Sequence, residues 1–234
     1  MRADLHTHTK ASPDSWIPPA KLALVAKRAG MDAVAVTDHN VAGAWEEVIE
    51  GARAAGIIAV PGEEVSVKPA GRTVGEIIGL FMNERVDGNG KGAHEIVDLL
   101  KRQDALVVLP HPFDSFRKIL PEGELRELAV KVDAVEVFNP RTVNPAFNEK
   151  AAAFALEYGL AQVGGSDAHS VREVGSGFTG LDALDEEGMR KAIRSKKTRA
   201  CGEYGNILFA KMASRSRKIL SDVSRVLGVR KKRG

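Results

Sequence analysis

Short apolar segments alternate with longer helical patterns along the first 200 residues of this chain. Strands that are buried on both faces read as continuous apolar runs, whereas helices repeat apolar residues every three or four positions. This criterion predicts seven strands, at Ala3–His6, Ala33–Thr37, Ile57–Val60, Val74–Phe81, Ala105–Leu109, Ala134–Phe138 and Ala161–Val163. Strands that alternate with helices in this way indicate an α/β fold, either a barrel or a doubly wound parallel sheet.

Proline and glycine mark the ends of several helices between these strands. Pro18-Pro19 begins a helix that closes at Gly30, since proline fits the first helical turn and glycine the residue after the last. Further helices are expected at Gly43–Ala55, Ala93–Gln103, Glu122–Val130, Pro145–Tyr158 and Glu186–Ser195. The glycine-rich loops that bind dinucleotides or nucleoside triphosphates are missing from the sequence.

Composition is that of a globular protein, with 234 residues, 44% of them hydrophobic and 28% charged. A chain of this size folds without a metal or a disulfide, so any metal would serve chemistry. Its single cysteine, Cys201, has no partner for an intramolecular bridge. No apolar run reaches the roughly 20 residues that span a bilayer, and the first residues lack the apolar part of a signal peptide. We therefore expect no transmembrane segment and a cytoplasmic location.

The charged residues that sum to the formal net charge of +3 are unevenly distributed along the chain. Residues 211–234 carry nine Lys or Arg and one acidic residue, which leaves 25 basic and 30 acidic residues in the first 210. Apolar residues at helical spacing over Ile207–Leu227 predict a basic amphipathic helix. We expect a catalytic domain over residues 1–206 and a basic helix and tail over residues 207–234. Such a tail can bind nucleic acid or an anionic membrane, but a solvated charge run on a packed terminal helix is favoured.

Histidine and acidic residues cluster where the expected strands end. The clusters are Asp4-Leu5-His6-Thr7-His8, followed by Asp14 in the loop, Thr37-Asp38-His39-Asn40, Pro61-Gly62-Glu63-Glu64-Val65-Ser66, Pro110-His111-Pro112-Phe113-Asp114 and Gly165-Ser166-Asp167-Ala168-His169. In α/β barrels the carboxyl ends of the strands carry the active site. Mixed imidazole and carboxylate ligands suit zinc, manganese or iron, and they outnumber what one tetrahedral ion can use. The pattern predicts two or three divalent ions. His94, inside a helical pattern, is expected to be an ordinary residue.

These motifs resemble those of the polymerase and histidinol phosphatase (PHP) family of metal-dependent phosphoesterases, from Asp4 to about Cys201. The resemblance implies a distorted seven-stranded (β/α) barrel with a three-metal centre. It implies that the first ion is held by His6, His8 and Asp167. Glu64 would bridge it to a second ion that also takes His111. The third ion would be held by Asp14, His39 and His169.

One position departs from the commoner family pattern. A histidine usually precedes the Leu-Gly-Leu stretch, whereas here Glu76 precedes Ile77-Ile78-Gly79-Leu80. A carboxylate can replace imidazole, so we expect Glu76 to complete the second ion and to favour manganese or iron. The alternative is that Glu76 orients a neighbouring ligand or faces solvent. Neighbouring strand residues face opposite ways, so only one of Glu63 and Glu64 can face the metals. The resemblance selects Glu64, and Glu63 is then expected to support a ligand or to be exposed.

The expected reaction is hydrolysis of a phosphate ester by a metal-bridging water held by Glu64. Arg141 is the leading candidate to bind the phosphate and Arg117 the second, although either can instead pair with an acidic residue. Few aromatic residues are present to stack on single strands, so a small phosphorylated metabolite or nucleotide is favoured over the end of an oligonucleotide. A barrel amidohydrolase and a regulatory binding module with a vestigial metal site are the alternatives. The sequence does not define an oligomeric state.

Overall fold

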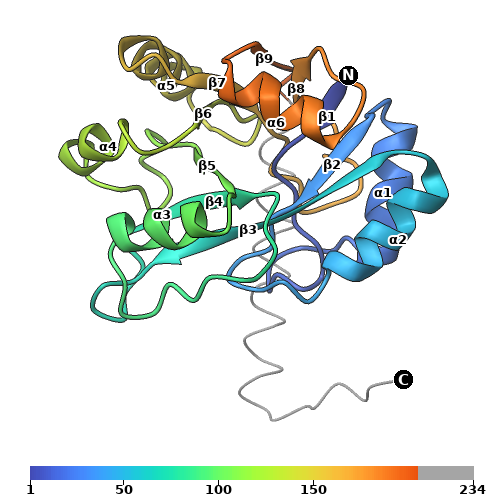
Figure 1. Cartoon of the computed structure of the whole chain (residues 1–234), viewed down its shortest axis with the longest axis horizontal. Coiled ribbons are helices and arrows are strands. Elements are labelled where there is room, and N and C mark those ends of the chain that lie inside the picture. The colour runs from blue at the N-terminus through green and yellow to red at the C-terminus, as the bar shows by residue number, and fades with distance from the viewer. Residues whose placement is uncertain (205–234) are drawn as a thin grey trace.

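One continuous sheet of nine strands runs through residues 1–204, the part of the chain described by the computed structural model (Figure 1). In chain order the strands are β1 (Arg2–Asp4), β2 (Ala33–Val36), β3 (Ile58–Val67), β4 (Gly75–Leu80), β5 (Leu106–Leu109), β6 (Ala134–Phe138), β7 (Ala161–Gly164), β8 (Gly177–Leu181) and β9 (Thr198–Gly202). Their order in space is β7-β6-β5-β4-β3-β2-β1-β8-β9. The helix expected at Ile207–Leu227 and the boundary after residue 206 lie outside the described residues.

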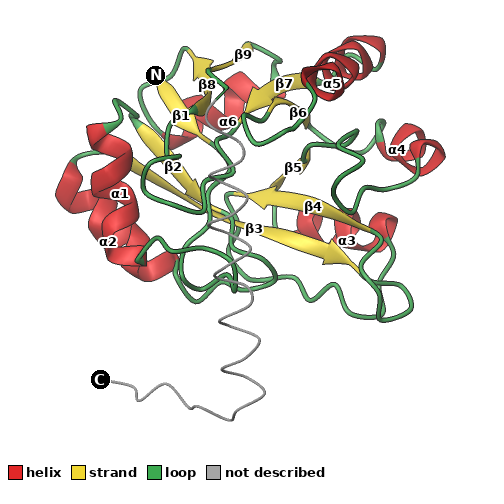
Figure 2. Cartoon of the chain, turned by 180° about the vertical axis from the view of Figure 1, so that it is seen from behind, coloured by secondary structure: helices red, strands yellow, loops and turns green. Residues whose placement is uncertain are grey.

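Six helices surround this sheet in the described residues (Figures 1 and 2). They are α1 (Pro19–Arg28), α2 (Trp45–Ala55), α3 (Ala93–Arg102), α4 (Glu122–Leu128), α5 (Pro145–Glu157) and α6 (Glu186–Arg194). Each lies within two residues of its expected range, because proline and glycine define the ends. The last turn of α2, for example, ends at Gly56, whose φ of 68° is a left-handed conformation that glycine adopts without strain. None of these helices combines the length and the apolar composition that a membrane span requires.

Three apolar clusters hold the helices to the sheet. Leu22 of α1 and Val48 of α2 pack with Val34 and Val36 of β2. A second cluster joins α3, α4 and α5 to strands β3 to β6. The third fills the space between the strands with small and branched side chains and includes Met189 and Ile193 of α6. The strands are therefore covered on both faces, as their apolar composition requires.

The two edges of the sheet meet, so that it is nearly closed into a barrel. The hydroxyl of Thr179 in β8 donates to the carbonyl oxygen of Gly164 in β7 and accepts from its N–H, both at 2.9 Å. Thr198 at the start of β9 donates its hydroxyl to the carbonyl oxygen of Gln162 at 2.8 Å. Two threonine hydroxyl groups thus connect β7 to the opposite edge of the sheet.

The expected count of seven strands is wrong, because β8 and β9 were not identified from the sequence. β8 reads Gly-Phe-Thr-Gly-Leu and β9 reads Thr-Arg-Ala-Cys-Gly, and neither is a continuous apolar run. The expectation of a parallel sheet holds for β1-β2-β3 and β5-β6-β7. β4 is antiparallel to both of its neighbours, and β8 is antiparallel to β1 and β9. The short 68–74 connection between β3 and β4 permits a hairpin but not a parallel crossover.

β3 is also longer than the expected segment Ile57–Val60. It continues through Pro61-Gly62-Glu63-Glu64 to Val67, pairing first with β2 and then with β4. The proline and glycine therefore do not end this strand. As a consequence, Glu64 lies within β3, while the histidines of the other clusters follow their strands.

Candidate metal centre

The nine residues expected to bind metal come together near the carboxyl ends of the parallel strands. His6 and His8 follow β1, His39 follows β2, and Glu64 lies in β3. Single backbone bridges from Thr7 to Ala168 and from His39 to Glu64 hold the loops in register with one another. Glu76 of β4, His111 after β5 and the β7 loop with Asp167 and His169 complete the group, together with Asp14.

The carboxylate of Glu64 lies at the centre of this cluster and is only 1% exposed. Its Oε1 lies 3.2 Å from Nε2 of His111. Its Oε2 lies 2.9 Å from Nδ1 of His39, 3.4 Å from Nε2 of His8 and 3.5 Å from Nε2 of His6. One carboxylate therefore faces histidines from three different segments of the chain, which is the position that a bridging ligand occupies.

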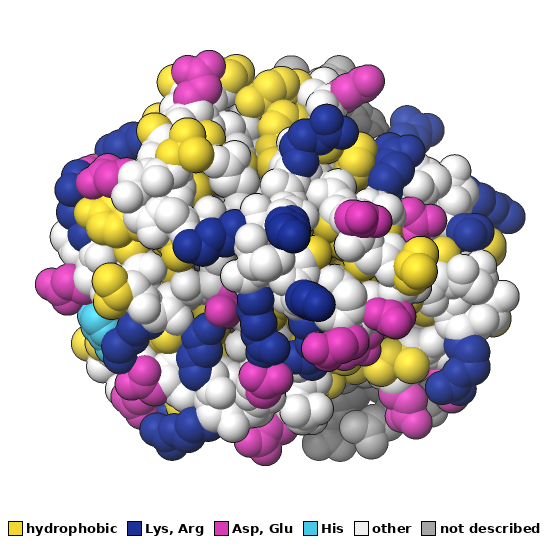
Figure 3. Space-filling model, turned by 45° about the horizontal axis from the view of Figure 1, so that its top comes forward, with side chains coloured by type: hydrophobic (Ala, Val, Ile, Leu, Met, Phe, Trp, Pro, Cys, Tyr) yellow, Lys and Arg dark blue, Asp and Glu magenta, His cyan; other side chains and the backbone are white. Residues whose placement is uncertain are grey.

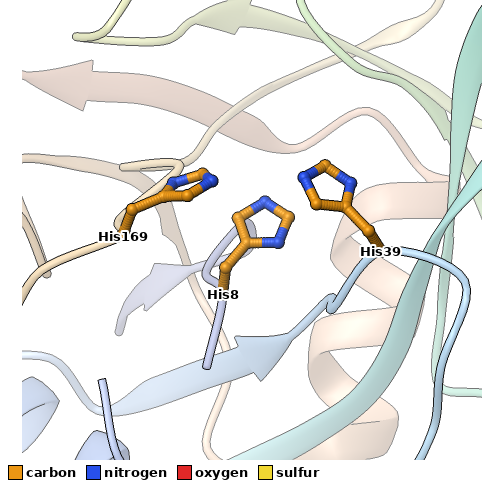
Figure 4. Close-up of side chains that lie close together, drawn as sticks. All are labelled: His8, His39 and His169. Carbon is orange, nitrogen blue, oxygen red and sulfur yellow. The ribbon is translucent and has the colours of Figure 1, made fainter. Parts of the chain in front are cut away.

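Four overlapping groups of side chains offer ligand atoms that all lie within 4.8 Å of one another. The groups are His6, His8 and Asp167; His6, Glu64 and His111; His39, Glu64 and Glu76; and His8, His39 and His169. Figure 4 shows the last group, with three imidazoles from separate segments turned toward one another. Residues that are distant in the sequence thus form one continuous set of ligand atoms.

The grouping differs in detail from the one that the resemblance implies. Glu76 is grouped with His39 and Glu64 rather than with His111. Asp14 lies next to the expected third-ion residues, with Oδ2 3.6 Å from Nε2 of His39 and 3.3 Å from Nε2 of His169. Glu76 is therefore placed among the possible ligands, on the side of the cluster where His39 lies.

Protonated histidines balance the negative charge of the buried carboxylates in the cluster. Burial favours the neutral form of His6, but the negative charges of Glu136 and Asp167 outweigh it and hold the pKa of His6 well above its usual range. Burial would raise the pKa of Glu64, but positive charge on His6 and His39 holds it well below its usual range. The site therefore contains negative charge that requires cations close by.

The pKa of His8 is lowered, in contrast to that of His6. Burial, with the neighbouring His39 and His169, lowers the pKa of His8 to about 3. His8 is therefore neutral at physiological pH, and the neutral imidazole is the form that binds a metal ion. Burial and the charge of Glu64 raise the pKa of Glu76, so a nearby cation would favour its ionised form.

Three buried polar atoms in the cluster lack hydrogen-bond partners, which tests whether these residues fit divalent ions. They are Oδ1 of Asp14, Oδ1 of Asp167 and Nδ1 of His111. Buried polar atoms are almost always hydrogen-bonded, and binding of an ion is one of the few explanations for an exception. Asp167 Oδ1 lies 3.3 Å from Nε2 of His8 and 3.7 Å from Nε2 of His6. The donor set of imidazoles and carboxylates therefore fits zinc, manganese or iron.

Glu136 in β6 is a further residue of the centre that sequence reasoning missed. Its Oε1 lies 2.9 Å from Nδ1 of His6, while its Oε2 accepts from the backbone N–H of His111 and from the side chain of Asn139. The signal was present, because a glutamate inside the apolar strand Ala-Val-Glu-Val-Phe is unusual. Asp38, beside the predicted ligand His39, likewise accepts hydrogen bonds from Thr9 and Ser12 in the β1 loop.

The backbone around the ligands adopts conformations that are costly for residues other than glycine. His111 has φ of 30° and Asp167 has φ of 52°, and such strain concentrates at functional sites. Gly165 brings the β7 loop onto β1, since a Cβ there would lie 2.4 Å from Cβ of His6. The loop that carries Asp167 therefore reaches His6 only because residue 165 has no side chain.

Both candidate phosphate-binding arginines contact Asp167. Nη1 of Arg117 lies 2.6 Å from Oδ2 of Asp167, and its Nε lies 3.2 Å from Asp114. Nε of Arg141 lies 3.8 Å from Asp167, and its Nη1 pairs with Glu173. Arg141, the leading candidate, is 8% exposed, while Arg117 is 21% exposed. Arg117 is thus the more accessible of the two.

Two other residues lie apart from the ligand groups. His94 is exposed on α3 and pairs with Glu127 at 3.2 Å. Glu63 is buried on the other face of β3, where it accepts a hydrogen bond from the N–H of Val86. Burial raises the pKa of Glu63 to about 7. The position of His94 agrees with the sequence-based expectation, whereas Glu63 is neither exposed nor bonded to a candidate ligand.

Two family models match the chain. The model of the PHP domain matches residues 4–140, more than half of the chain, and that of the PHP-associated domain matches residues 145–198. Two uncharacterized proteins of Methanocaldococcus jannaschii are similar in sequence. One is 37% identical over 149 residues, which cover 59% of this chain and 82% of the relative. The other is 34% identical over 194 residues, which cover 80% of this chain and 73% of the relative.

Solved structures share the fold at lower identity. A two-domain protein from Bacteroides vulgatus that contains a predicted PHP-like metal-dependent phosphoesterase has a TM-score of 0.69 and 21% identity. The similarity covers 87% of this chain but only 65% of that protein. A lesion-specific endonuclease from Pyrococcus furiosus has a TM-score of 0.57 and 18% identity, covering 83% of this chain and 56% of the endonuclease. These similarities show the fold, whereas the reaction depends on the residues of the site.

Proposed function

The chain belongs to the PHP domain family, and from this premise we propose that it is a metal-dependent hydrolase of phosphate esters acting on a small phosphorylated molecule. The observation that carries the proposal is the position of Glu64 within two of the four overlapping ligand groups. Divalent ions in such a cluster supply a nucleophilic hydroxide at neutral pH and neutralise negative charge on a phosphate. Glu64 would hold the attacking water, since its two oxygens face different histidines.

The two arginines would bind the phosphate oxygens of the substrate. Arginine presents a planar array of donors that suits phosphate, and Arg117 combines partial exposure with a position next to Asp167. Asp114 fixes the guanidinium of Arg117 through Nε, and Glu173 pairs with Nη1 of Arg141. Asp14 and His169 would assist departure of the alcohol; Oδ2 of Asp14 lies 3.3 Å from Nε2 of His169, whose ring contacts that of His8.

The first experiment measures bound metal and hydrolysis of 4-nitrophenyl phosphate by the purified full chain with manganese or zinc. We expect more than one equivalent of metal, and activity that is lost on chelation and restored by metal. The His6→Ala, His8→Ala double variant should lose activity and most of its metal, because three of the four ligand groups contain His6 or His8. A matched His94→Ala variant should retain both, because His94 is exposed and outside the cluster.

Two results would reject the proposal. Activity that resists chelation or survives the double variant would separate hydrolysis from the cluster. Less than one equivalent of metal with no activity would favour a binding module with a vestigial site. A 4-nitroanilide assayed in parallel tests the amidohydrolase alternative, which would be favoured if the amide were cleaved and the phosphate ester were not.

A further inference from the structure

Within residues 1–204, the cluster of possible ligands is partly exposed on the side where Asp14, His39 and Glu76 lie. Among the possible ligands, Asp14, His39 and Glu76 are 17–22% exposed, as is Arg117 beside them. The other ligands are at most 5% exposed. Substrate must therefore approach past these partly exposed residues.

Exposed basic residues lie on the same segments that border this opening. The 5–18 loop carries Asp14 and the exposed Lys10. The 68–74 turn, which leads into β4 and Glu76, carries the exposed Arg72 and the half-buried Lys68. The 110–121 loop carries Arg117 and the exposed Lys118. On these three segments no acidic residue is exposed, since Asp114 is buried and Asp14 belongs to the cluster.

The positive charges of Lys10, Arg72 and Lys118 are not neutralised by acidic residues in the described part of the chain. None of the three forms a salt bridge with another residue among residues 1–204. Nearby acidic residues are engaged elsewhere. Asp87, beside the 68–74 turn, lies 3.9 Å from Arg85, and Glu122 at the start of α4 pairs with Arg126 and Lys150.

The opposite side of the molecule has a mixed surface. The connections there expose Asp32, Asp104, Asp182 and Asp185 together with Lys131, Lys196 and Lys197. Figure 3, which looks onto the side that carries α6, shows Lys and Arg side chains interspersed with Asp and Glu. The excess of basic side chains on the three bordering segments is thus a local feature of a domain whose first 210 residues are acidic overall.

From this arrangement we infer that the substrate carries at least one phosphate group in addition to the one that is cleaved, and that Lys10, Arg72 and Lys118 recognise it. This inference rests on the proposed phosphoesterase function. A single phosphate would be satisfied by Arg117, Arg141 and the metal ions, which leaves the three exposed cations on the bordering segments without a role. Cations around a cleft attract anionic substrates and raise their association rate by about 10- to 1,000-fold at low ionic strength.

The test compares substrates that differ in the number of phosphate groups. The pairs are fructose 6-phosphate with fructose 1,6-bisphosphate, and thymidine 5′-phosphate with a 5′-phosphorylated tetrathymidylate. The variant Lys10→Glu, Arg72→Glu, Lys118→Glu should lower kcat/KM for the more highly charged member of at least one pair by about 10-fold or more relative to its partner. The loss should shrink as salt is raised, because screening weakens exposed charges. The control Lys191→Glu, Lys196→Glu, Lys197→Glu changes the net charge equally and should leave the ratios unchanged.

The two pairs distinguish the source of the added phosphate. A loss confined to the tetranucleotide identifies the end of a nucleic acid strand, and a loss with both pairs or with the bisphosphate identifies a phosphorylated metabolite. Equal losses for both members of each pair, or the same losses in the control, would overturn the inference while hydrolysis itself stands. Where the loss falls on the tetranucleotide, fluorescence anisotropy of a labelled 5′-phosphorylated tetrathymidylate gives a readout independent of turnover, and unchanged binding by the variant Lys10→Glu, Arg72→Glu, Lys118→Glu would then count against the inference.

Discussion

Glu136 links two candidate ligands through a single buried carboxylate. Its Oε1 contacts Nδ1 of His6, which leaves Nε2 of that ring directed at His8 and Glu64. A carboxylate in this position fixes the tautomer of a histidine ligand and raises its basicity. Because Oε2 accepts from the N–H of His111, the same residue also holds the loop after β5. Metal affinity should therefore depend on a residue that contacts no metal.

The variant Glu136→Gln tests this dependence. An amide keeps the size of the side chain but loses the charge that orients and polarises His6, so metal affinity should fall by roughly 10- to 100-fold. Isothermal titration with zinc or manganese measures the change without relying on turnover. The control Glu127→Gln removes an exposed carboxylate that pairs with His94 and should leave the affinity unchanged. An unchanged affinity in Glu136→Gln would show that His6 is oriented by its packing alone.

At the scale of elements, the closing of the sheet depends on side chains rather than on a backbone ladder. Thr179 is fully buried and satisfies both the N–H and the carbonyl oxygen of Gly164. Gly164 is followed directly by the loop that carries Asp167, and a Cβ at position 164 would lie 2.8 Å from the carbonyl oxygen of Phe178. The junction between β7 and β8 thus supports both the barrel and one wall of the metal centre.

Replacing Thr179 with valine keeps its shape but removes the hydroxyl group. Two buried backbone groups of Gly164 then lose their partner, which should lower the free energy of unfolding by about 1–3 kcal/mol. Urea denaturation followed by circular dichroism measures the loss. Thr73→Val, in the partly exposed turn between β3 and β4, is the matched substitution and should change stability by less than about 0.5 kcal/mol. Equal stability of the two variants would exclude a closing role for the hydroxyl of Thr179.

An element could be predicted from the sequence where the residues that define it lie close together along the chain. The helices were predictable because residues such as Gly56 and Pro145 act within a single turn. β8 and β9 could not be identified, since their stability comes from pairing with β1 and with each other rather than from an apolar run. The grouping of Glu76 with His39 depends on β4 running antiparallel to β3, a tertiary feature that has no local pattern.

At the scale of the whole molecule, the cluster concentrates acidic groups where water cannot reach them. Glu64, Glu136 and Asp167 are each at most 2% exposed. Buried carboxylates are costly unless cations lie close by, and here protonated His6 and His39 and the guanidinium of Arg117 provide the positive charge. Divalent ions would take over this role. Metal binding should therefore be coupled to the stability of the entire domain.

Removing metal should lower the thermal stability of the protein. A ligand that binds only the folded state at about 100 times its dissociation constant stabilises that state by roughly 2.7 kcal/mol, which corresponds to about 5–10 °C in Tm for a domain of this size. Differential scanning calorimetry before and after chelation should show this shift, and added zinc or manganese should reverse it. The His6→Ala, His8→Ala variant should show a smaller shift, because three of its four ligand groups are incomplete, whereas His94→Ala should behave as the unaltered chain. An equal metal-dependent shift in the double variant would show that the stabilising ion is not held by His6 or His8.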